Sequence, residues 1–146
     1  MRDKLRVAAY LVLMKGDQVL LLQRHNTGWE DGNFSLVSGH VEFEECPTDA
    51  IVREALEESA IRVQADKLEC VQVVHRWCHP ELVYIDYFFR TRQWSGEPTI
   101  QEPDKCSALE WHSILELPEN SIEYVKVILT RVHQGKYGLF EYGWRT

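Results

Sequence analysis

Three glutamates stand close together in the segment REALEES, residues 53–59, at a spacing that puts them on one side of any helix formed there. Glu54, Glu57 and Glu58 occupy relative positions i, i+3 and i+4, whose side chains are neighbours on a helix surface. Each close pair of like charges costs an isolated helix about 0.2–0.5 kcal/mol. Carboxylates near a helix C-terminus also oppose its dipole. Both features destabilise the helix locally, and sequences keep such unfavourable arrangements mainly at functional sites. We therefore expect these carboxylates to bind a ligand or to catalyse a reaction.

A divalent cation would turn this repulsion into binding. Mg²⁺ is a hard ion that takes oxygen ligands, keeps several waters and commonly joins a few carboxylates to substrate phosphates. Further acids precede the helix on a loop that Gly39 opens, namely Glu42, Glu44 and Glu45, and Arg53 is embedded among them. The alternative is a solvated acidic face, which explains neither the embedded arginine nor the acids at the negative end of the helix.

The segment GHVEFEECPTDAIVREALEESAI, residues 39–61, resembles the Nudix box, whose pattern is G-x5-E-x7-R-E-U-x-E-E-x-G-U with U apolar. The matching positions are Gly39, Glu45, Arg53, Glu54, Ala55, Glu57, Glu58 and Ile61. The departures are Ser38 and Glu44, where many members have Gly, and Ala60, where the box has Gly. If residue 60 takes the left-handed conformation, alanine costs on the order of 1 kcal/mol there and strains the helix exit without removing a ligand.

The resemblance implies hydrolysis of a nucleoside diphosphate linked to another group X, by a water that attacks phosphorus. Mg²⁺, or alternatively Mn²⁺, would neutralise charge on the phosphates, in agreement with the general chemistry of phosphoryl hydrolysis. Either Glu54 or Glu58 would be the base, and Arg53 would hold the acids in place through Glu45. Carried over position by position, the metal ligands would be the Gly39 carbonyl, Glu54, Glu57 and Glu58.

Outside the box, two segments resemble the same family more loosely. NTGWEDGNFSLVSGHVE resembles the entry to the box in MutT-like members, and EPDKCSALEWHSILELPEN, residues 102–120, resembles a segment of the nucleoside-triphosphate diphosphatase branch. The resemblance therefore favours release of pyrophosphate from a (d)NTP, modified or oxidised ones included. Glu102, on a loop rich in Gly and Pro, is a further candidate metal ligand, and the alternative is an ordinary loop acid.

The candidate substrate-binding residues are cationic, hydrogen-bonding or aromatic: Arg24, Asn33, Phe34, His40 and Trp77. Asn33 could read a base edge, although a turn beside Gly32 explains it equally well. The rings of Trp29, Phe34, Trp77 and Tyr84 could stack on a base. Core packing is the alternative for each ring, because aromatic residues fill cores whatever the function.

Two other functions compete with this interpretation. One keeps the fold and the metal but changes X, giving a hydrolase of ADP-ribose, nucleotide sugars or dinucleotide polyphosphates. The start MRDKLRVAAY leaves little room for the extra N-terminal structure of dimeric ADP-ribose members. The other is a non-catalytic ligand sensor on the same fold, which the retained box acids argue against.

Composition and charge limit the class of protein. The chain has 146 residues, of which 45% are apolar and 27% charged, with a net charge of −7, as expected for a single globular domain spanning residues 1–146. Because no basic run is present, binding to a nucleic-acid polymer is not expected. The longest apolar run, residues 7–14, is too short for a membrane span. Four scattered cysteines without a C-x-x-C pair favour a reducing cytoplasm.

Apolar runs and turn residues predict the strands and helices that position the acidic residues. Strands are predicted at residues 7–14, 19–24, 34–37, 68–74, 83–89 and 108–111. Helices are predicted from Pro47 to about Ser59, with Pro in the first turn, and over residues 121–135, with Gly at the C-cap. SGHVEFEE is expected to be an irregular loop. The aromatic tail KYGLFEYGW is expected to pack on the body or on a second subunit, as in a homodimer.

This order of elements favours an α/β (α+β) fold, a sandwich of a mixed β-sheet and flanking helices, and the resemblance implies that it is the Nudix-type α/β/α sandwich. The segment around His75, Cys78 and His79 could be a zinc fragment, but a strand end and a turn at Pro80 explain it without metal. The expected partner is a small nucleotide substrate, with no nucleic-acid polymer and no membrane.

Overall fold

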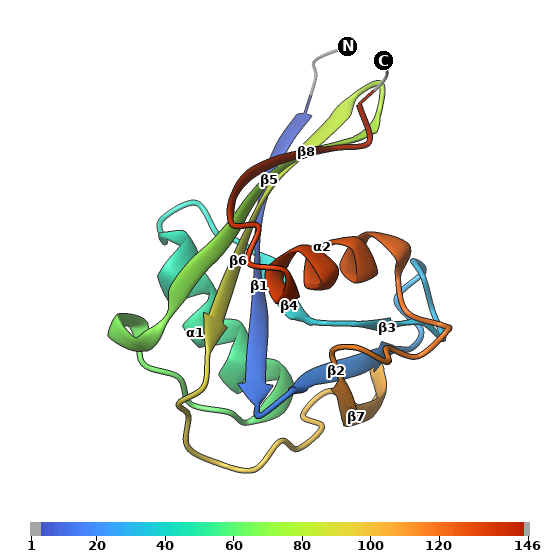
Figure 1. Cartoon of the computed structure of the whole chain (residues 1–146). Coiled ribbons are helices and arrows are strands. Elements are labelled where there is room, and N and C mark those ends of the chain that lie inside the picture. Colours follow the sequence, from blue (N-terminus) through green and yellow to red (C-terminus); the bar gives the residue numbers. More distant parts are fainter. Residues whose placement is uncertain (1–3, 145–146) are drawn as a thin grey trace.

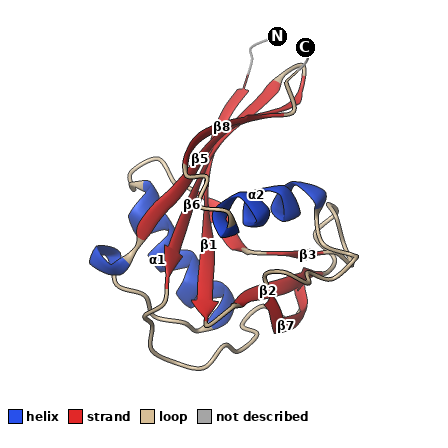
Figure 2. Cartoon of the chain, in the orientation of Figure 1, coloured by secondary structure: helices blue, strands red, loops and turns tan. Residues whose placement is uncertain are grey.

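The computed structural model describes residues 4–144 and shows two helices on opposite faces of one mixed β-sheet (Figures 1 and 2). The strands are β1 (Lys4–Lys15), β2 (Gln18–Arg24), β3 (Phe34–Ser35), β4 (Val37–His40), β5 (Glu69–His79), β6 (Leu82–Thr91), β7 (Cys106–Ser113) and β8 (Gly138–Tyr142). The helices are α1 (Pro47–Ser59), α2 (Glu123–His133) and the short 3₁₀ helix η1 (Ala65–Lys67).

The sheet runs in the order β3-β2-β1-β6-β5-β8, with β4 paired to β1 and β7 paired to β2. β1 is parallel to β6 and β5 is parallel to β8, while the other pairs are antiparallel. The predicted α/β/α sandwich with a mixed sheet is therefore confirmed.

The central strand β1 is buried on both faces. Its residues Ala8, Tyr10 and Val12 join the core beneath α2, whereas Ala9 and Leu11 join the core beneath α1. A strand covered by a helix on each side needs apolar residues at every position rather than at alternate ones. This explains the continuous run VAAYLVLM.

The predicted hairpin of residues 7–14 and 19–24 is confirmed by the antiparallel pairing of β1 with β2. The expectation that SGHVEFEE is irregular throughout was wrong for its first three residues. Ser38, Gly39 and His40 belong to β4, because their backbones pair with residues 8–10 of β1. The aromatic tail packs on the body, as predicted, and does so as strand β8. β5 ends at His79, as the interpretation without zinc required.

Helix α1 begins and ends where its sequence predicts. Pro47 lies in the first turn, and Ala60 follows the last turn in the left-handed conformation, with φ of 61°. The Ala60 N–H donates to the Leu56 carbonyl at 3.1 Å and the Ile61 N–H to the Ala55 carbonyl at 3.3 Å. These bonds satisfy carbonyls that a helix end leaves open. The exit is therefore a tight turn held on a non-glycine residue.

The sheet extends beyond both helices. β1, β5, β6 and β8 continue past α1 and α2 as a narrow arm (Figure 1), which carries the paired residues 4–5, 77–79 and 82–83 together with Trp144. Trp144 is 42% exposed there, and its indole Nε1–H donates to the His75 carbonyl at 2.7 Å. Within residues 4–144, neither the length nor the hydropathy of any helix suits it to crossing a membrane.

Candidate active site

Arg53 lies at the centre of the acidic cluster. Its guanidinium forms two bonds to Glu45, from Nη2 to Oε1 at 2.6 Å and from Nε to Oε2 at 3.1 Å. Nη1 donates to Glu54 at 2.7 Å and to Glu57 at 3.1 Å, and Nη2 also donates to the His40 carbonyl at 3.2 Å. Paired bonds between an arginine and a carboxylate fix direction as well as charge. Arg53 therefore ties the loop before α1 and strand β4 to the helix.

Gly39 meets Glu54 where β4 crosses α1. A Cβ atom at residue 39 would lie 2.3 Å from the Glu54 carboxyl group, so any side chain there would displace that carboxylate. Gly39 sits in β4, held by its pairing with Ala9 of β1. Residue 39 is therefore glycine because the Glu54 side chain approaches its backbone closely, and not because the backbone has an unusual φ angle.

Glu58 is the most strongly perturbed carboxyl group of the cluster. Burial, followed by the nearby charge of Glu54, raises the pKa of Glu58 to about 8, although the Ser38 N–H donates to its Oε1 at 2.9 Å. Burial also raises the pKa of Glu54 in spite of Arg53. By contrast, the bonds from Arg53 lower the pKa of Glu45. The cluster thus holds two partly buried carboxyl groups whose charged forms are disfavoured by burial.

Glu102 reaches the same cluster from another part of the chain, the loop between β6 and β7. Its charge contributes to raising the pKa values of both Glu54 and Glu58. Its partner among the basic residues is Lys105, whose Nζ lies 3.9 Å from the carboxylate. The one candidate ligand from outside the box is therefore close enough to the box acids for its charge to act on them.

The residues fit a divalent cation by their chemistry. No group of three or more His, Cys, Asp or Glu side chains in the described part of the chain is already arranged around a common point, since Glu54 and Glu57 both bond to Arg53. The donors are nevertheless carboxylate and carbonyl oxygens, which Mg²⁺ prefers. The raised pKa values of Glu54 and Glu58 indicate a site that gains from added positive charge.

Two of the candidate substrate-binding residues have a link to this cluster, Arg24 through its charge and His40 through its backbone carbonyl, which accepts a bond from Arg53. The Arg24 charge acts to lower the pKa of Glu58, while its Nε donates to the Trp29 carbonyl at 2.7 Å. His40 follows Gly39 directly and is exposed, and its Nε2 lies 2.9 Å from the Tyr84 hydroxyl group.

The other three candidates have different surroundings. The Asn33 side-chain amide donates to Glu30 at 2.6 Å, within its own loop, in keeping with the turn interpretation. Phe34 is buried in the core beneath α2, in keeping with the packing interpretation. Trp77 lies on the arm, with its ring centroid 6.5 Å from that of Trp144.

Sequence reasoning missed a buried ionic network on the α2 side of the sheet. Asp86 is fully buried and accepts bonds from Arg76 Nε and from the Tyr124 hydroxyl group, each at 2.7 Å. The Arg76 guanidinium lies between the rings of Tyr84, at 4.4 Å, and Tyr124, at 4.7 Å. The available signal was the aspartate inside the apolar run VYIDYFF, because a buried charge requires a partner.

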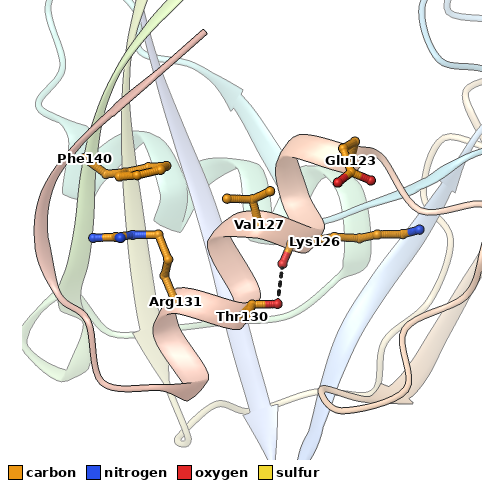
Figure 3. A pocket seen from close by; sticks show the side chains of 6 residues that line it. All are labelled: Glu123, Lys126, Val127, Thr130, Arg131 and Phe140. Carbon is orange, nitrogen blue, oxygen red and sulfur yellow. Dashed lines mark hydrogen bonds between the residues drawn. The ribbon is translucent and has the colours of Figure 1, made fainter.

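A shallow hollow of about 340 Å³ opens between α2 and β8 (Figure 3). Its walls are formed by Glu123, Lys126, Val127, Thr130, Arg131 and Phe140. The Arg131 guanidinium packs on the Phe140 ring at 4.0 Å and donates to Gln72 at 3.0 Å. Because α2 covers the face of the sheet opposite to α1, this hollow is separate from the acidic cluster.

Comparison with known proteins adds to this geometry. The NUDIX domain family model matches residues 4–130. The NAD-capped RNA hydrolase NudC of Pseudomonas putida (strain GB-1) is 27% identical over 120 residues, which cover 81% of this chain and 41% of NudC. The chain thus spans less than half the length of this curated relative.

Solved structures show the same fold. The structure of a MutT NUDIX hydrolase from Burkholderia pseudomallei superposes with a TM-score of 0.81 and 25% identity, covering 89% of this chain and 99% of that one. A MutT protein from Methanosarcina mazei Go1 superposes with a TM-score of 0.78 and 18% identity, covering 93% and 98%.

Proposed function

Since the chain belongs to the NUDIX domain family, we propose that it is a divalent-metal-dependent pyrophosphohydrolase. Its substrate would be a (d)NTP, ordinary or oxidised, and its products the monophosphate and pyrophosphate. The observation that carries this proposal is the group of carboxylates that Arg53 holds on α1 against the backbone of Gly39. Glu102 supports it by adding a carboxylate from a distant loop.

In the proposed reaction a water oxygen forms a bond to phosphorus as the anhydride P–O bond breaks, and pyrophosphate leaves. The water proton passes to Glu54 or Glu58. Mg²⁺, or Mn²⁺, held by Glu57, Glu102, these two carboxylates and the Gly39 carbonyl, would neutralise phosphate charge and make the water more acidic. Burial raises the pKa of Glu58 to about 8 in the metal-free protein, and a bound cation would lower it.

Arg53 has a positioning role in this proposal. Its two bonds to Glu45 hold the guanidinium in one orientation, and from there it directs Glu54 and Glu57. A lysine could supply the charge but not this geometry. The non-catalytic sensor is disfavoured because every box carboxylate is present. Arg53 bonds to Glu45, Glu54 and Glu57, and the Ser38 N–H donates to Glu58.

The second candidate substrate class joins the nucleoside diphosphate to a sugar or to another nucleoside. The relative from P. putida, named as a hydrolase of NAD-capped RNA, favours including NAD among the substrates tested. The fold does not decide between these classes, because one fold supports many specificities. The resemblance of residues 102–120 to the triphosphate branch favours the first class.

Product analysis separates the two candidates. Ordinary and oxidised (d)NTPs, ADP-ribose, NAD, nucleotide sugars and dinucleotide polyphosphates would each be incubated with Mg²⁺, with Mn²⁺ and with EDTA. We expect Mg²⁺-dependent release of pyrophosphate and a nucleoside monophosphate from one triphosphate. If a nucleoside diphosphate joined to a sugar or nucleoside is instead cleaved into two phosphorylated organic products, the second substrate class is the correct one. Turnover that persists in EDTA, or no turnover of any compound, would refute a metal-dependent hydrolase.

The variant Glu57→Gln tests whether Glu57 is a metal ligand. Glu57 is exposed, and among residues 4–144 its side chain bonds to Arg53 alone, so its replacement should leave the melting temperature nearly unchanged. We expect loss of most Mg²⁺-dependent turnover, and unchanged activity would remove Glu57 from the metal ligands.

A further inference from the structure

A second cavity, of about 370 Å³, lies at the C-terminal end of α2, where that helix meets the ends of β1 and β6. Its volume is in the range of small-molecule sites. Met14, Ile114 and Val132 line it, and all three are buried in the core beneath α2. The cavity therefore lies on the face of the sheet opposite to α1 and the acidic cluster.

The charged side chains that line this cavity are mostly cationic. Arg90 and Arg92 come from the end of β6 and the residue after it, and His133 is the last residue of α2. Asp17, in the turn between β1 and β2, is the acid among the lining residues. The chain as a whole carries a net charge of −7. A cavity with two guanidinium groups in such a chain provides a local positive potential that attracts anions.

Arg90 is held in one direction by two partners. Its Nη2 donates to Glu69 at 2.7 Å and its Nη1 to the Tyr137 hydroxyl oxygen at 2.9 Å. The Tyr137 ring also lies against the guanidinium, with its centroid 5.1 Å from the central carbon. A side chain that is already ordered loses little conformational entropy when a ligand binds. Arg90 is therefore prepared to bind.

Arg92 keeps more of its positive charge uncompensated. Its Nη1 donates to the Gly16 carbonyl at 2.9 Å, which fixes the side chain without neutralising it. Over residues 4–144, Glu69 is the carboxylate that forms an ion pair with Arg90, and Arg92 forms no ion pair. The bonds described also leave further N–H donors of both guanidinium groups unused. Both arginines can therefore donate to a ligand.

The C-terminus of α2 opposes an anion in this cavity, because a helix carries partial negative charge there. The opposition is reduced by the backbone that follows the helix. The carbonyls of residues 130–132 accept bonds at 2.9–3.1 Å from the N–H groups of residues 134–136. Full charges on two arginines outweigh the partial charges that remain.

We propose that this cavity binds a small polyanion, with one phosphate or carboxylate group on Arg90 and another on Arg92, beside His133 at the rim. The planar fork of arginine matches either type of group. The cavity has room for more than one such group. Binding here needs no metal, in contrast to the acidic cluster, where a cation must come between the carboxylates and a phosphate. The inference therefore does not depend on the proposed function.

Calorimetric titration in a buffer freed of divalent metal tests the inference. Pyrophosphate and citrate are the probes with several anionic groups, and inorganic phosphate and acetate are the probes with one. We expect pyrophosphate, citrate or both to bind at least about tenfold more tightly than the probes with one group, because two guanidinium groups act together. Binding of pyrophosphate alone assigns the site to phosphate compounds, and binding of citrate alone assigns it to carboxylates.

Variants locate the bound anion. Arg92→Gln should weaken binding by about 10- to 150-fold, the range for hydrogen bonds to charged groups. His133→Glu places a carboxylate at the rim and should weaken binding as well. Both residues are exposed, so the melting temperature without anion should change little. Arg62→Gln is the matched control, because it removes the same charge from another exposed arginine and should bind like the natural protein.

Four results would overturn the inference: no binding of either larger probe, equal affinity for all four probes, full affinity in Arg92→Gln, or an equal loss in Arg62→Gln. Pyrophosphate binding that requires Mg²⁺ and is lost in Glu57→Gln would also overturn it, because that binding belongs to the acidic cluster. The outcome is distinct from that of the proposed function. If no compound is hydrolysed but metal-free binding depends on Arg92, the reaction is wrong and the anion site stands.

Discussion

The Arg53 guanidinium donates hydrogen bonds to four partners, which are Glu45, Glu54, Glu57 and the carbonyl of His40. Glu42 also lies 3.8 Å from this guanidinium, so four carboxylates around one arginine leave a net negative site. The arrangement therefore suits a partner that brings positive charge, and it explains why like charges are tolerated at the end of α1.

Replacing Arg53 by lysine tests geometry apart from charge. Lysine keeps the cation but has no planar fork, so it cannot hold Glu45 and Glu54 in their present directions. We expect kcat to fall by about 10- to 100-fold, the range found for residues that orient metal ligands, while the protein still folds. Arg62→Lys is the control, because Arg62 is exposed and should keep full turnover. Wild-type kcat in Arg53→Lys would show that charge alone suffices.

Glu58 gives the metal-free protein a pH-dependent stability. Its folded-state pKa of about 8 lies above the ordinary value of 4.5, so the folded state favours the protonated form. The associated stability is fully present below pH 4.5 and is lost as the pH rises through 8. In EDTA, Glu58→Gln should therefore raise the melting temperature at pH 9 and change it little at pH 5. Equal effects at both pH values would contradict this environment for Glu58.

The residues of the box were predictable from spacing, because a helix fixes which side chains share a face. Glu54, Glu57 and Glu58 indeed lie on α1, and Gly39 approaches it. The aspartate inside an apolar run indicated that Asp86 needs a partner, but the partners were not predictable, since Arg76 and Tyr124 come from a different strand and from α2. Local periodicity carries no information about such long-range pairs.

At the scale of elements, the exit of α1 is strained in a way that one substitution can relieve. Ala60 holds a φ of 61°, which glycine adopts without a Cβ clash. Ala60→Gly should raise the free energy of unfolding by about 1 kcal/mol, measured by urea denaturation, with kcat unchanged. Gly96→Ala is the opposite change, because a Cβ there would lie 2.8 Å from the Ala60 carbonyl oxygen. It should destabilise the same exit, and a stabilising effect would contradict the close approach.

The ionic network joins three elements through the core beneath α2. Asp86 on β6 bonds to Arg76 on β5 and to Tyr124 on α2. Removing the carboxylate by Asp86→Leu leaves the buried Arg76 charge unpaired, which costs about 3–5 kcal/mol. Tyr124→Phe removes one hydroxyl bond and should cost only about 1–2 kcal/mol. Chemical denaturation measures whether Asp86→Leu lowers the free energy of unfolding more than Tyr124→Phe does. Equal losses in the two variants would show that Arg76 finds another partner.

Element boundaries were predictable where turn residues or caps mark them, as at Pro47 of α1 and at the turn between β1 and β2. They were not predictable at β4 and β8. Ser38, Gly39 and His40 have weak strand preferences, and their extended form comes from pairing with β1. β8 is likewise fixed by its parallel pairing with β5. Tertiary pairing therefore decided both elements.

At the scale of the whole molecule, the arm raises the question of a second subunit. The outer edge of β8 has no strand beside it in the described residues, and Leu139 is exposed there. Homodimer formation stays a prediction, as does action in the cytoplasm on free nucleotides. Sedimentation velocity over a range of protein concentrations measures whether a homodimer forms. If a dimer forms through β8, Leu139→Lys should give the monomer, and a dimer that survives this change uses another surface.

The parallel pairing of β1 with β6 has a consequence for how the protein is made. β1 pairs along its length with residues 82–91, more than half the chain away. On the ribosome, the nascent chain therefore carries an apolar strand with one open edge until β6 emerges, and such edges promote association between chains. Non-local pairing also slows folding. Early termination products should aggregate or occupy chaperones, even when they already contain the whole of α1.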